Sequence, residues 1–390
     1  MRKKISVGVT FGLIFLSIAL TAIATMLIVQ HKTNTLLGDL PEKQARYEVL
    51  DELDSLIAEH YYGKNDSKAM RRAIESGYVS GLSDGVSRLL SAEEFKQFQA
   101  VSRGQMQGVG FTFSKTEKGV LKVEEVTKGS PAAQGGIKKG DSIVAVDAIV
   151  LDPSNCDEIA QKLENENVMT VSVTYRHKSQ ETTVELEKAF EAASVFTDTY
   201  QNIGYLQITD FYDSTASQVQ SAVELLQSSG VRALVIDVRE NASMNVENAI
   251  KTLDVFVPLN QETPAATLVD KAGETISTLS TSAGEVNLPL AVLVSKKTAY
   301  AGELFACDLR DFGKAQLVGT STAGKALVTD SFRLSDGDHV LLSVGEMLPY
   351  KSESFQEKGL APDLEASGTE DAEKLSKDSQ FLAAAALFTE

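Results

Sequence analysis

Cysteine and histidine are scarce in this chain of 390 residues, and acidic residues outnumber basic ones by 54 to 37. The two cysteines, Cys156 and Cys307, fall in different predicted domains, so we expect no disulfide framework. The histidines are too scattered to predict a metal site: His31, His60, His177 and His339. A net charge of −17 opposes binding to phosphate backbones and anionic lipid surfaces. The composition therefore predicts no cofactor and no nucleic-acid partner.

A long uncharged run, residues 5–29, follows the basic residues 2–4 (Arg-Lys-Lys). Its length suits one membrane-spanning helix, and the charges before it predict a cytoplasmic N-terminus with the bulk of the chain extracytoplasmic. The alternative is a cleaved signal peptide, because residues 22–24 (Ala-Ile-Ala) have the small-x-small form of a cleavage site. The apolar run continues beyond that site, which favours an uncleaved single-pass anchor in the cell membrane. We assign residues 1–30 to a cytoplasmic tip and this transmembrane anchor.

Residues 31–103 are predicted to form a helical segment. Apolar residues recur there at helical spacing on two stripes, namely Tyr47, Leu50, Leu53, Leu56 and Ile57, then Met70, Ile74, Tyr78 and Leu82. Ser91 is a suitable N-cap for the last helix, because Glu93 and Glu94 follow it in the first turn.

Residues 104–190 have the clearest domain pattern in the chain. A glycine loop leads into a strand, and residues 128–141 give a strand end, a short helix and a turn. Two alternating strands, at 143–146 and 170–175, complete the pattern. This combination resembles a PDZ domain.

In a PDZ domain an extended peptide pairs with the strand after the glycine loop, and loop N–H groups hold the terminal carboxylate. The resemblance implies binding of protein or peptide C-termini, with these contacts: Gly108, Val109, Gly110 and Phe111. By analogy, a helix at 154–164 lines the groove. The alternative is a domain that only packs against its neighbour and binds nothing.

Strand and helix patterns alternate after residue 194. The predicted elements are strands at 203–208, 233–238 and 288–294 and helices at 214–228 and 245–256. Such alternation is typical of an α/β core with crossover connections. We therefore predict an α/β, more broadly α+β, multidomain protein whose largest domain is 191–390.

The stretch 291–329 is suited to hold a site, because it has the pattern of a strand, a sharp turn, a helix, a strand and a Gly-Lys loop. The polar turn 295–298 would present Tyr300 at the start of a helix predicted for 302–312. Free backbone N–H groups at a helix start stabilise anions. An anionic group is therefore expected to be stabilised beside Tyr300.

This stretch resembles the carboxy-terminal processing peptidases, or tail-specific proteases, which are serine peptidases with a Ser/Lys pair. Their nucleophile segment is roughly Ser-Ala-Ser-Ala-Ser-Glu and corresponds here to Thr-Ala-Tyr-Ala-Gly-Glu at 298–303. Further matches follow at 311–315, 318–319, 324–325 and 359–363. The resemblance implies a crotonase-like α/β peptidase core, with Lys325 at the base position and Tyr300 at the nucleophile position.

Substitutions surround the implied site. Tyr300 replaces a small, mobile hydroxyl with a rigid ring that would occupy the space of the substrate carbonyl. The family's Pro-Gly-Gly turn, which helps to form the oxyanion hole, is Ala-Ser-Met at 242–244, so the implied oxyanion positions are Met244 and Ala301. Glycine permits φ angles that cost other residues about 1 kcal/mol or more. Thr329 stands where the family favours glutamine. Together these changes predict impaired catalysis.

Two functions remain open at this point. In the favoured one, the protein is a membrane-tethered member of the family that binds or regulates proteins without cleaving them. In the other, it is an active serine-type endopeptidase for C-terminal or unfolded segments, with Thr298 or Ser295 attacking and Lys325 as base. We expect the Thr298 side chain to lie outside the helix-start pocket, and Glu303 and Asp311 to have structural roles. Neither an oligomeric state nor a partner peptidase follows from the sequence.

Overall fold

The computed structural model describes residues 21, 23, 25–26, 40–164, 169–257, 263–281, 286–368 and 374–388. They divide into two compact units, residues 1–74 and 75–390. The predicted membrane span, residues 5–29, lies outside the described residues apart from four positions. Within the described ranges, no helix is both long enough and apolar enough to cross a membrane.

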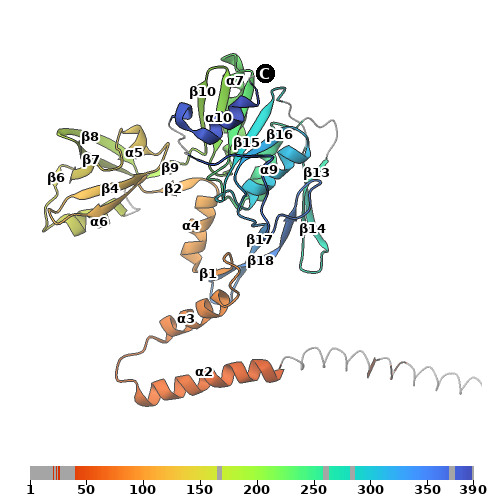
Figure 1. Ribbon diagram of the computed structural model, residues 1–390. Coiled ribbons are helices and arrows are strands. Elements are labelled where there is room, and N and C mark those ends of the chain that lie inside the picture. Colours follow the sequence, from red (N-terminus) through yellow and green to blue (C-terminus); the bar gives the residue numbers. More distant parts are fainter. Residues whose placement is uncertain are drawn as a thin grey trace, which may run out of the picture. The chain divides into compact units, whose positions relative to one another are not determined.

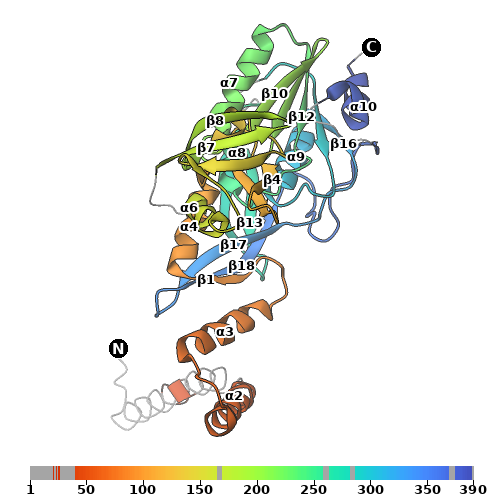
Figure 2. The same cartoon turned by 90° about the vertical axis from the view of Figure 1, so that its left-hand side faces the viewer.

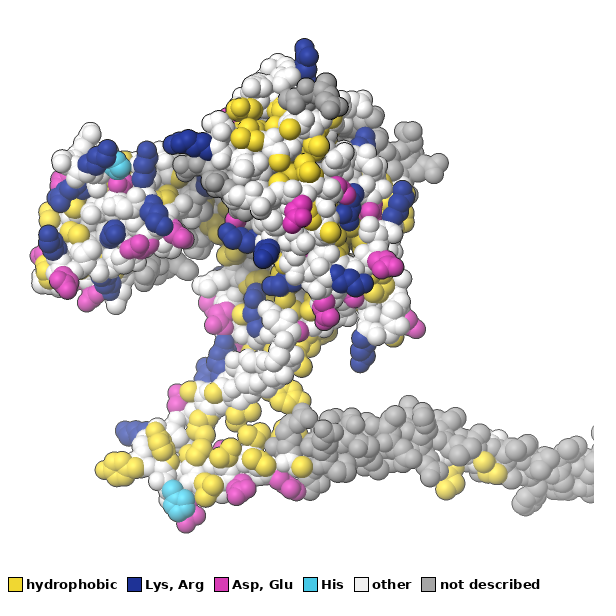
Figure 3. Space-filling model, in the orientation of Figure 1, with side chains coloured by type: hydrophobic (Ala, Val, Ile, Leu, Met, Phe, Trp, Pro, Cys, Tyr) yellow, Lys and Arg dark blue, Asp and Glu magenta, His cyan; other side chains and the backbone are white. Residues whose placement is uncertain are grey.

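The first unit contains α2 (Leu40–His60) and the start of α3 (Ser67–Ser80), which confirms two helices of the predicted helical segment. Several apolar side chains of α2 stay on its surface, among them Tyr47, Leu53 and Leu56 (Figure 3). Packing within this unit therefore leaves those side chains in contact with solvent.

A short strand interrupts the predicted helical segment. β1 (Arg88–Leu90) pairs antiparallel with β18 (His339–Leu348), so the expectation of helix alone is wrong for these residues. Three residues are too few to give an alternating pattern in a sequence. The helix after it, α4 (Ala92–Ser102), begins at Ser91 as predicted. The Ser91 hydroxyl accepts from the Glu94 N–H at 3.2 Å, and the Glu94 carboxylate accepts from the Ser91 N–H at 2.7 Å, which completes a capping box.

The domain predicted for 104–190 folds around its own core. Its main sheet has the order β3-β4-β5-β7-β8, with β6 on β5, and the elements are β3 (Phe111–Lys115), β4 (Leu121–Val126), β5 (Ser142–Val146), β6 (Ile149–Val150), β7 (Thr170–His177), β8 (Gln180–Glu187), α5 (Pro131–Gln134) and α6 (Cys156–Glu164). Leu121, Val123, Ile143 and Val173 are completely buried in it. A two-stranded ribbon of β2 (Gln105–Gln107) and β9 (Ala189–Glu191) closes the ends of the domain. In the main sheet of the domain, β3 is an edge strand.

The C-terminal core is built on a six-stranded sheet with the order β10-β11-β12-β15-β16-β19, parallel except for β10 (Figures 1 and 2). Its strands are β10 (Val195–Tyr200), β11 (Ile203–Ile208), β12 (Ala233–Asp237), β15 (Leu290–Val294), β16 (Ala315–Gly319) and β19 (Leu364–Glu365). Its helices are α7 (Thr215–Ser228), α8 (Val246–Leu253), α9 (Ala301–Asp311), the short 3₁₀ helix η1 (Leu375–Lys377) and α10 (Ser379–Ala386). The predicted alternation of strands and helices is confirmed.

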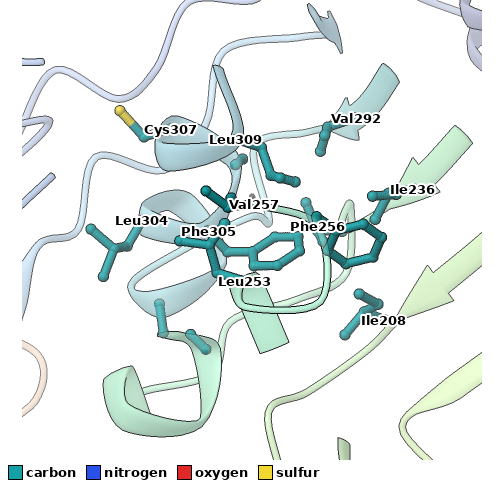
Figure 4. Close-up of a cluster of buried hydrophobic side chains, with 14 of the residues drawn as sticks. Ile208, Ile236, Leu253, Phe256, Val257, Val292, Leu304, Phe305, Cys307 and Leu309 are labelled. Carbon is teal, nitrogen blue, oxygen red and sulfur yellow. The ribbon is translucent and has the colours of Figure 1, made fainter. Parts of the chain in front are cut away.

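Alternate residues of each strand face opposite layers. Ile208, Ile236 and Val292 pack against α7, α8 and α9, and Figure 4 shows them around Phe256 and Phe305. Their neighbours along the strands, such as Tyr205, Val235 and Leu293, pack against Phe381 of α10 instead. Both faces of the sheet are therefore covered, which explains why its strands are continuous apolar runs in the sequence.

A second sheet was not predicted. It joins β1, β18, β13 (Thr263–Val269) and β14 (Thr275–Thr281) in that order, and β17 (Leu327–Arg333) pairs with the other side of β18. In the described part of the chain β17 pairs on one side only. Most residues of β17 and β14 are partly or fully exposed, so these strands lack the apolar runs that revealed the first sheet.

Candidate functional site

Tyr300 lies at a strained turn between β15 and α9, where the sequence predicted a site. It is the N-cap of α9 and adopts φ 53° and ψ −120°. A residue other than glycine in such a conformation costs about 1–3 kcal/mol and persists only where its surroundings hold it. Here the Tyr300 carbonyl accepts from the Glu303 and Leu304 N–H groups at 3.0 and 3.1 Å. The turn therefore keeps a sharp conformation despite its large side chain.

Glu303 connects the start of α9 to the Gly-Lys loop. Its buried carboxylate accepts the Thr322 hydroxyl and the N–H groups of Gly324 and Lys325, the last two at 2.8 Å. Burial raises the pKa of the Glu303 carboxyl above its ordinary value, while these donors oppose the rise. The structural role expected for Glu303 is confirmed: it fixes the backbone on which Lys325 stands.

The side chains of Lys325 and Tyr300 meet. The Lys325 Nζ lies 5.4 Å from the centroid of the Tyr300 ring, within the range of a cation–π contact. Tyr300 is half-buried and Lys325 is exposed. The structure thus brings together the two residues that the resemblance placed at the nucleophile and base positions, and the lysine faces an aromatic ring.

The turn 242–244 packs directly against the start of α9. The Ala299 N–H donates to the Asn241 carbonyl, and the Ala301 N–H donates to the Ser243 carbonyl, both at 2.9 Å. Ser243 is buried, and its own N–H donates to Asn241 Oδ1 at 3.1 Å. A Cβ on Gly302 would lie 2.6 Å from the Asn241 carbonyl oxygen, so only glycine fits there. The Ala301 N–H is one of the two implied oxyanion donors, and its hydrogen bond to the Ser243 carbonyl means that it is already bonded within the chain.

The two hydroxyls proposed as replacement nucleophiles have structural partners. Thr298 Oγ1 donates to the Val238 carbonyl at 2.9 Å and accepts from the Ser295 N–H at 3.0 Å. Ser295 Oγ donates to the Arg239 carbonyl at 2.8 Å and accepts from the Lys297 N–H at 3.1 Å. Both residues are buried. Their hydroxyls hold the end of β12 against the start of α9 and have no bond to Lys325.

Asp311 has the structural role that was expected. Its carboxylate accepts from the N–H groups of Lys351 and Ser352 at 2.9 and 2.7 Å, and from the Ser352 hydroxyl at 2.6 Å. It therefore holds the chain after β18 against the end of α9.

A cleft of about 680 Å³ lies beside the site. Met244 and Thr329, two residues singled out in the sequence, line it, together with residues from α4, the turn 242–247, β13, β14 and β17. Phe95 and Phe98 of α4 contribute aromatic surface. These two were not predicted to lie at the site, because the residue pattern of α4 does not indicate which part of the core the helix packs against.

The glycine loop of residues 108–111 leads into the edge strand β3. The carbonyls of Val109 and Gly110 accept from the N–H groups of Ala132 and Thr127, and the Gly108 N–H donates to the Lys188 carbonyl at 2.7 Å. The N–H groups of Val109 and Gly110 have no bond to any described residue. Two adjacent unbonded donors beside a strand edge suit a carboxylate.

Gly110 and α6 were both expected to lie beside a bound peptide. Gly110 has φ 87°, and a Cβ there would lie 2.1 Å from the Ser130 Cβ. α6 begins at Cys156, two residues after the predicted start, and Lys115 of β3 forms an ion pair with its Asp157. The strand and the helix expected to flank a peptide are therefore neighbours.

The same two-domain arrangement is found in known proteins. The family model for peptidase family S41 matches residues 202–366, and the PDZ domain model matches residues 108–187. This combination of an S41 match and a PDZ match supports the resemblance of the chain to the C-terminal processing peptidases.

Relatives support this assignment along most of the chain. A probable CtpA-like serine protease of Staphylococcus haemolyticus is 27% identical over 354 residues, which cover 90% of this chain and 70% of the relative. A probable CtpA-like serine protease of Staphylococcus aureus strain MSSA476 is 25% identical over 360 residues, covering 92% and 71%.

Two solved structures share the fold. The photosystem II D1 C-terminal processing protease has a TM-score of 0.51 at 21% identity, covering 84% of this chain and 88% of that one. A putative S41 protease from Bacteroides fragilis has a TM-score of 0.52 at 17% identity, covering 84% and 90%. At these identities the likeness concerns the fold alone.

Proposed function

We propose that this protein binds extended peptides and does not hydrolyse them. The observation that carries the proposal is the state of the site at the start of α9. Tyr300 occupies the nucleophile position under Lys325, and the Ala301 N–H is bonded to the Ser243 carbonyl.

Each part of that state opposes acyl transfer. A Ser/Lys mechanism needs a small hydroxyl whose proton the lysine can take, and a phenol on a rigid ring fills the space of the substrate carbonyl. An oxyanion needs donors that are free to point at it, and a donor already bonded to a carbonyl is not free. Lys325 is exposed to solvent, whereas lysines used as general bases are typically buried.

Two surfaces support binding. The edge strand β3, with the open N–H groups of Val109 and Gly110, suits a peptide with a free C-terminus. The cleft beside Met244 and Thr329 suits a further length of extended chain. Peptides could therefore be held at two places without being cut.

We also propose that residues 5–29 anchor the protein as a single membrane span, with the described domains outside the cytoplasm. The uncharged run and the basic residues before it support this. Protease added to intact cells should digest a tag placed after Glu390. Full protection of the tag would refute the orientation, and a mature N-terminus near Thr25 would refute the anchor.

The proposed function is tested with fluorescein-labelled casein as an unstructured substrate. The wild-type protein should release fluorescent fragments no faster than its Lys325→Ala variant, while a labelled peptide with a free apolar C-terminus binds to both. Amidation of that C-terminus should weaken binding. Turnover by the wild type that depends on Lys325 would refute the absence of catalysis, and failure of the peptide to bind would refute the binding role.

A further inference from the structure

The cleft beside the site has an uneven charge. Three of the residues that line it are acidic, namely Asp210 before α7, Glu247 in the first turn of α8, and Asp330 of β17. Lysine, arginine and histidine are absent from its lining in the described part of the chain. The carboxylates come from three different elements, so they are spread around the cleft and are not one local cluster.

The wall of the cleft formed by β17 presents a free strand edge. Four consecutive residues of this strand, 328–331, line the cleft. The register of β17 against β18 shifts between Val328 and Thr329, so these two residues can share one face. Beyond the shift, residues 329–331 line the cleft in succession, which indicates that the backbone edge borders the space, because side chains alternate between the two faces of a regular strand. The partner of β17 is β18, and within the described ranges its opposite edge is unpaired.

The remaining lining is largely apolar. Phe95, Phe98, Leu268 and Leu279 provide surfaces on which the methylene stems of long basic side chains can lie while their charged ends reach the carboxylates. An acidic side chain would meet three like charges in the same space and would be disfavoured.

We propose that the cleft takes an extended peptide as an additional strand on β17 and selects basic side chains at alternate positions through Asp210, Glu247 and Asp330. This inference rests on the proposed peptide-binding function and adds the chemistry of the occupant. The strand edge supplies main-chain hydrogen bonds for any sequence. The carboxylates supply the preference among sequences.

The test uses the full chain and three fluorescein-labelled peptides in which threonine alternates with lysine, glutamine or glutamate. All three are amidated at the C-terminus, so that the loop at Gly110 has no carboxylate to bind. Fluorescence anisotropy at low and high salt gives the affinities. The lysine peptide should bind about tenfold more tightly than the glutamine peptide at low salt, and the glutamate peptide more weakly than both, because exposed ion pairs contribute up to about fivefold each. High salt should reduce the differences.

Variants assign the preference to the cleft. Glu247→Gln combined with Asp330→Asn removes two exposed carboxylates and should reduce the preference for lysine by about fivefold or more. The matched control, Glu185→Gln combined with Glu187→Gln, removes two exposed carboxylates from β8 and should keep the preference. Circular dichroism melting checks that each variant is folded.

The outcomes are distinct. Equal binding of the three peptides would overturn the charge selection and leave the peptide-binding function intact. If none of the three peptides bound, the proposal that the cleft takes an extended peptide would be overturned. Binding of a peptide with a free C-terminus tests the proposed peptide-binding function separately. An equal loss of preference in the β8 control would also overturn the inference, since the selection would then come from net charge.

Discussion

Restoring a serine at position 300 should recover little activity by itself. In the Tyr300→Ser variant a small hydroxyl would face Lys325, but the Ala301 N–H would still donate to the Ser243 carbonyl at 2.9 Å. Loss of one oxyanion donor typically costs about 100- to 1,000-fold in rate, or about 2.7–4 kcal/mol of transition-state stabilisation. The single variant should therefore reach about one hundredth or less of the rate that the same site attains with a free donor.

The complementary change is in the turn. Ala242→Pro, Ser243→Gly and Met244→Gly restore the family's residues and should release the Ala301 N–H, because glycines permit backbone conformations in which the carbonyl of residue 243 points elsewhere. Added to Tyr300→Ser, these changes should raise the rate by about 100-fold or more. Without Tyr300→Ser they should do nothing measurable, because a nucleophile and an oxyanion hole act as a unit.

The assay is release of fluorescent fragments from labelled casein. Lys325→Ala in the restored variant should abolish turnover, while Lys271→Ala, which removes an exposed lysine between β13 and β14, should not. If Tyr300→Ser alone matched the combined variant, the bonded Ala301 N–H would not be limiting. That result would refute the claim that the turn 242–244 limits the rate.

Three further predictions concern groups around the site and the PDZ loop. Burial raises the pKa of the Asp308 carboxyl well above its ordinary value, so the folded protein favours the protonated carboxyl. The contribution of Asp308 to the free energy of unfolding is therefore complete below about pH 4, and it falls by about 1.4 kcal/mol per pH unit as the pH rises towards the folded pKa. In urea titrations, Asp308→Asn should therefore raise the free energy of unfolding at about pH 8 and change it little at about pH 4. An equal effect at both pH values would contradict the raised pKa of Asp308. Arg239→Ala should cost about 3–5 kcal/mol in the same titrations, because Asp237 and Asp378 would be left buried without their cation, and a cost under about 1 kcal/mol would be inconsistent with this network. Gly110→Ala should abolish binding of a peptide with a free C-terminus, since its Cβ would lie 2.1 Å from that of Ser130, whereas Gly140→Ala, at φ 88° with open space around it, should retain binding.

The elements that position the site could be predicted where burial was complete. β11 begins and ends at the predicted residues, and α9 starts within one residue of its predicted start, because runs of buried apolar residues leave clear patterns. The meeting of Tyr300 and Lys325 followed from the resemblance to the peptidase family. β17 and β18 were missed because their half-exposed residues give no such pattern.

Other features depend on backbone direction, which residue types do not encode. The substitutions at 242–244 predicted a disturbed oxyanion turn, but not that the Ser243 carbonyl would bond to the Ala301 N–H. The hydroxyls of Thr298 and Ser295 were candidate nucleophiles in the sequence, and only their bonds to the carbonyls of Val238 and Arg239 assign them a structural role.

The way in which Glu303 holds the Gly-Lys loop has a consequence for mutational tolerance. Its carboxylate binds the backbone N–H groups of Gly324 and Lys325, so the path of the loop is independent of the side chain at position 325. A chain that had lost the need for a base could exchange this lysine at no cost to the loop. Gly324 has no such freedom, because it adopts φ 74° and a Cβ there would lie 2.8 Å from the Gly359 backbone nitrogen. Among the described residues, the cation–π contact with the Tyr300 ring favours a positive charge at position 325. A saturation library at this position should therefore tolerate many residues but favour lysine and arginine.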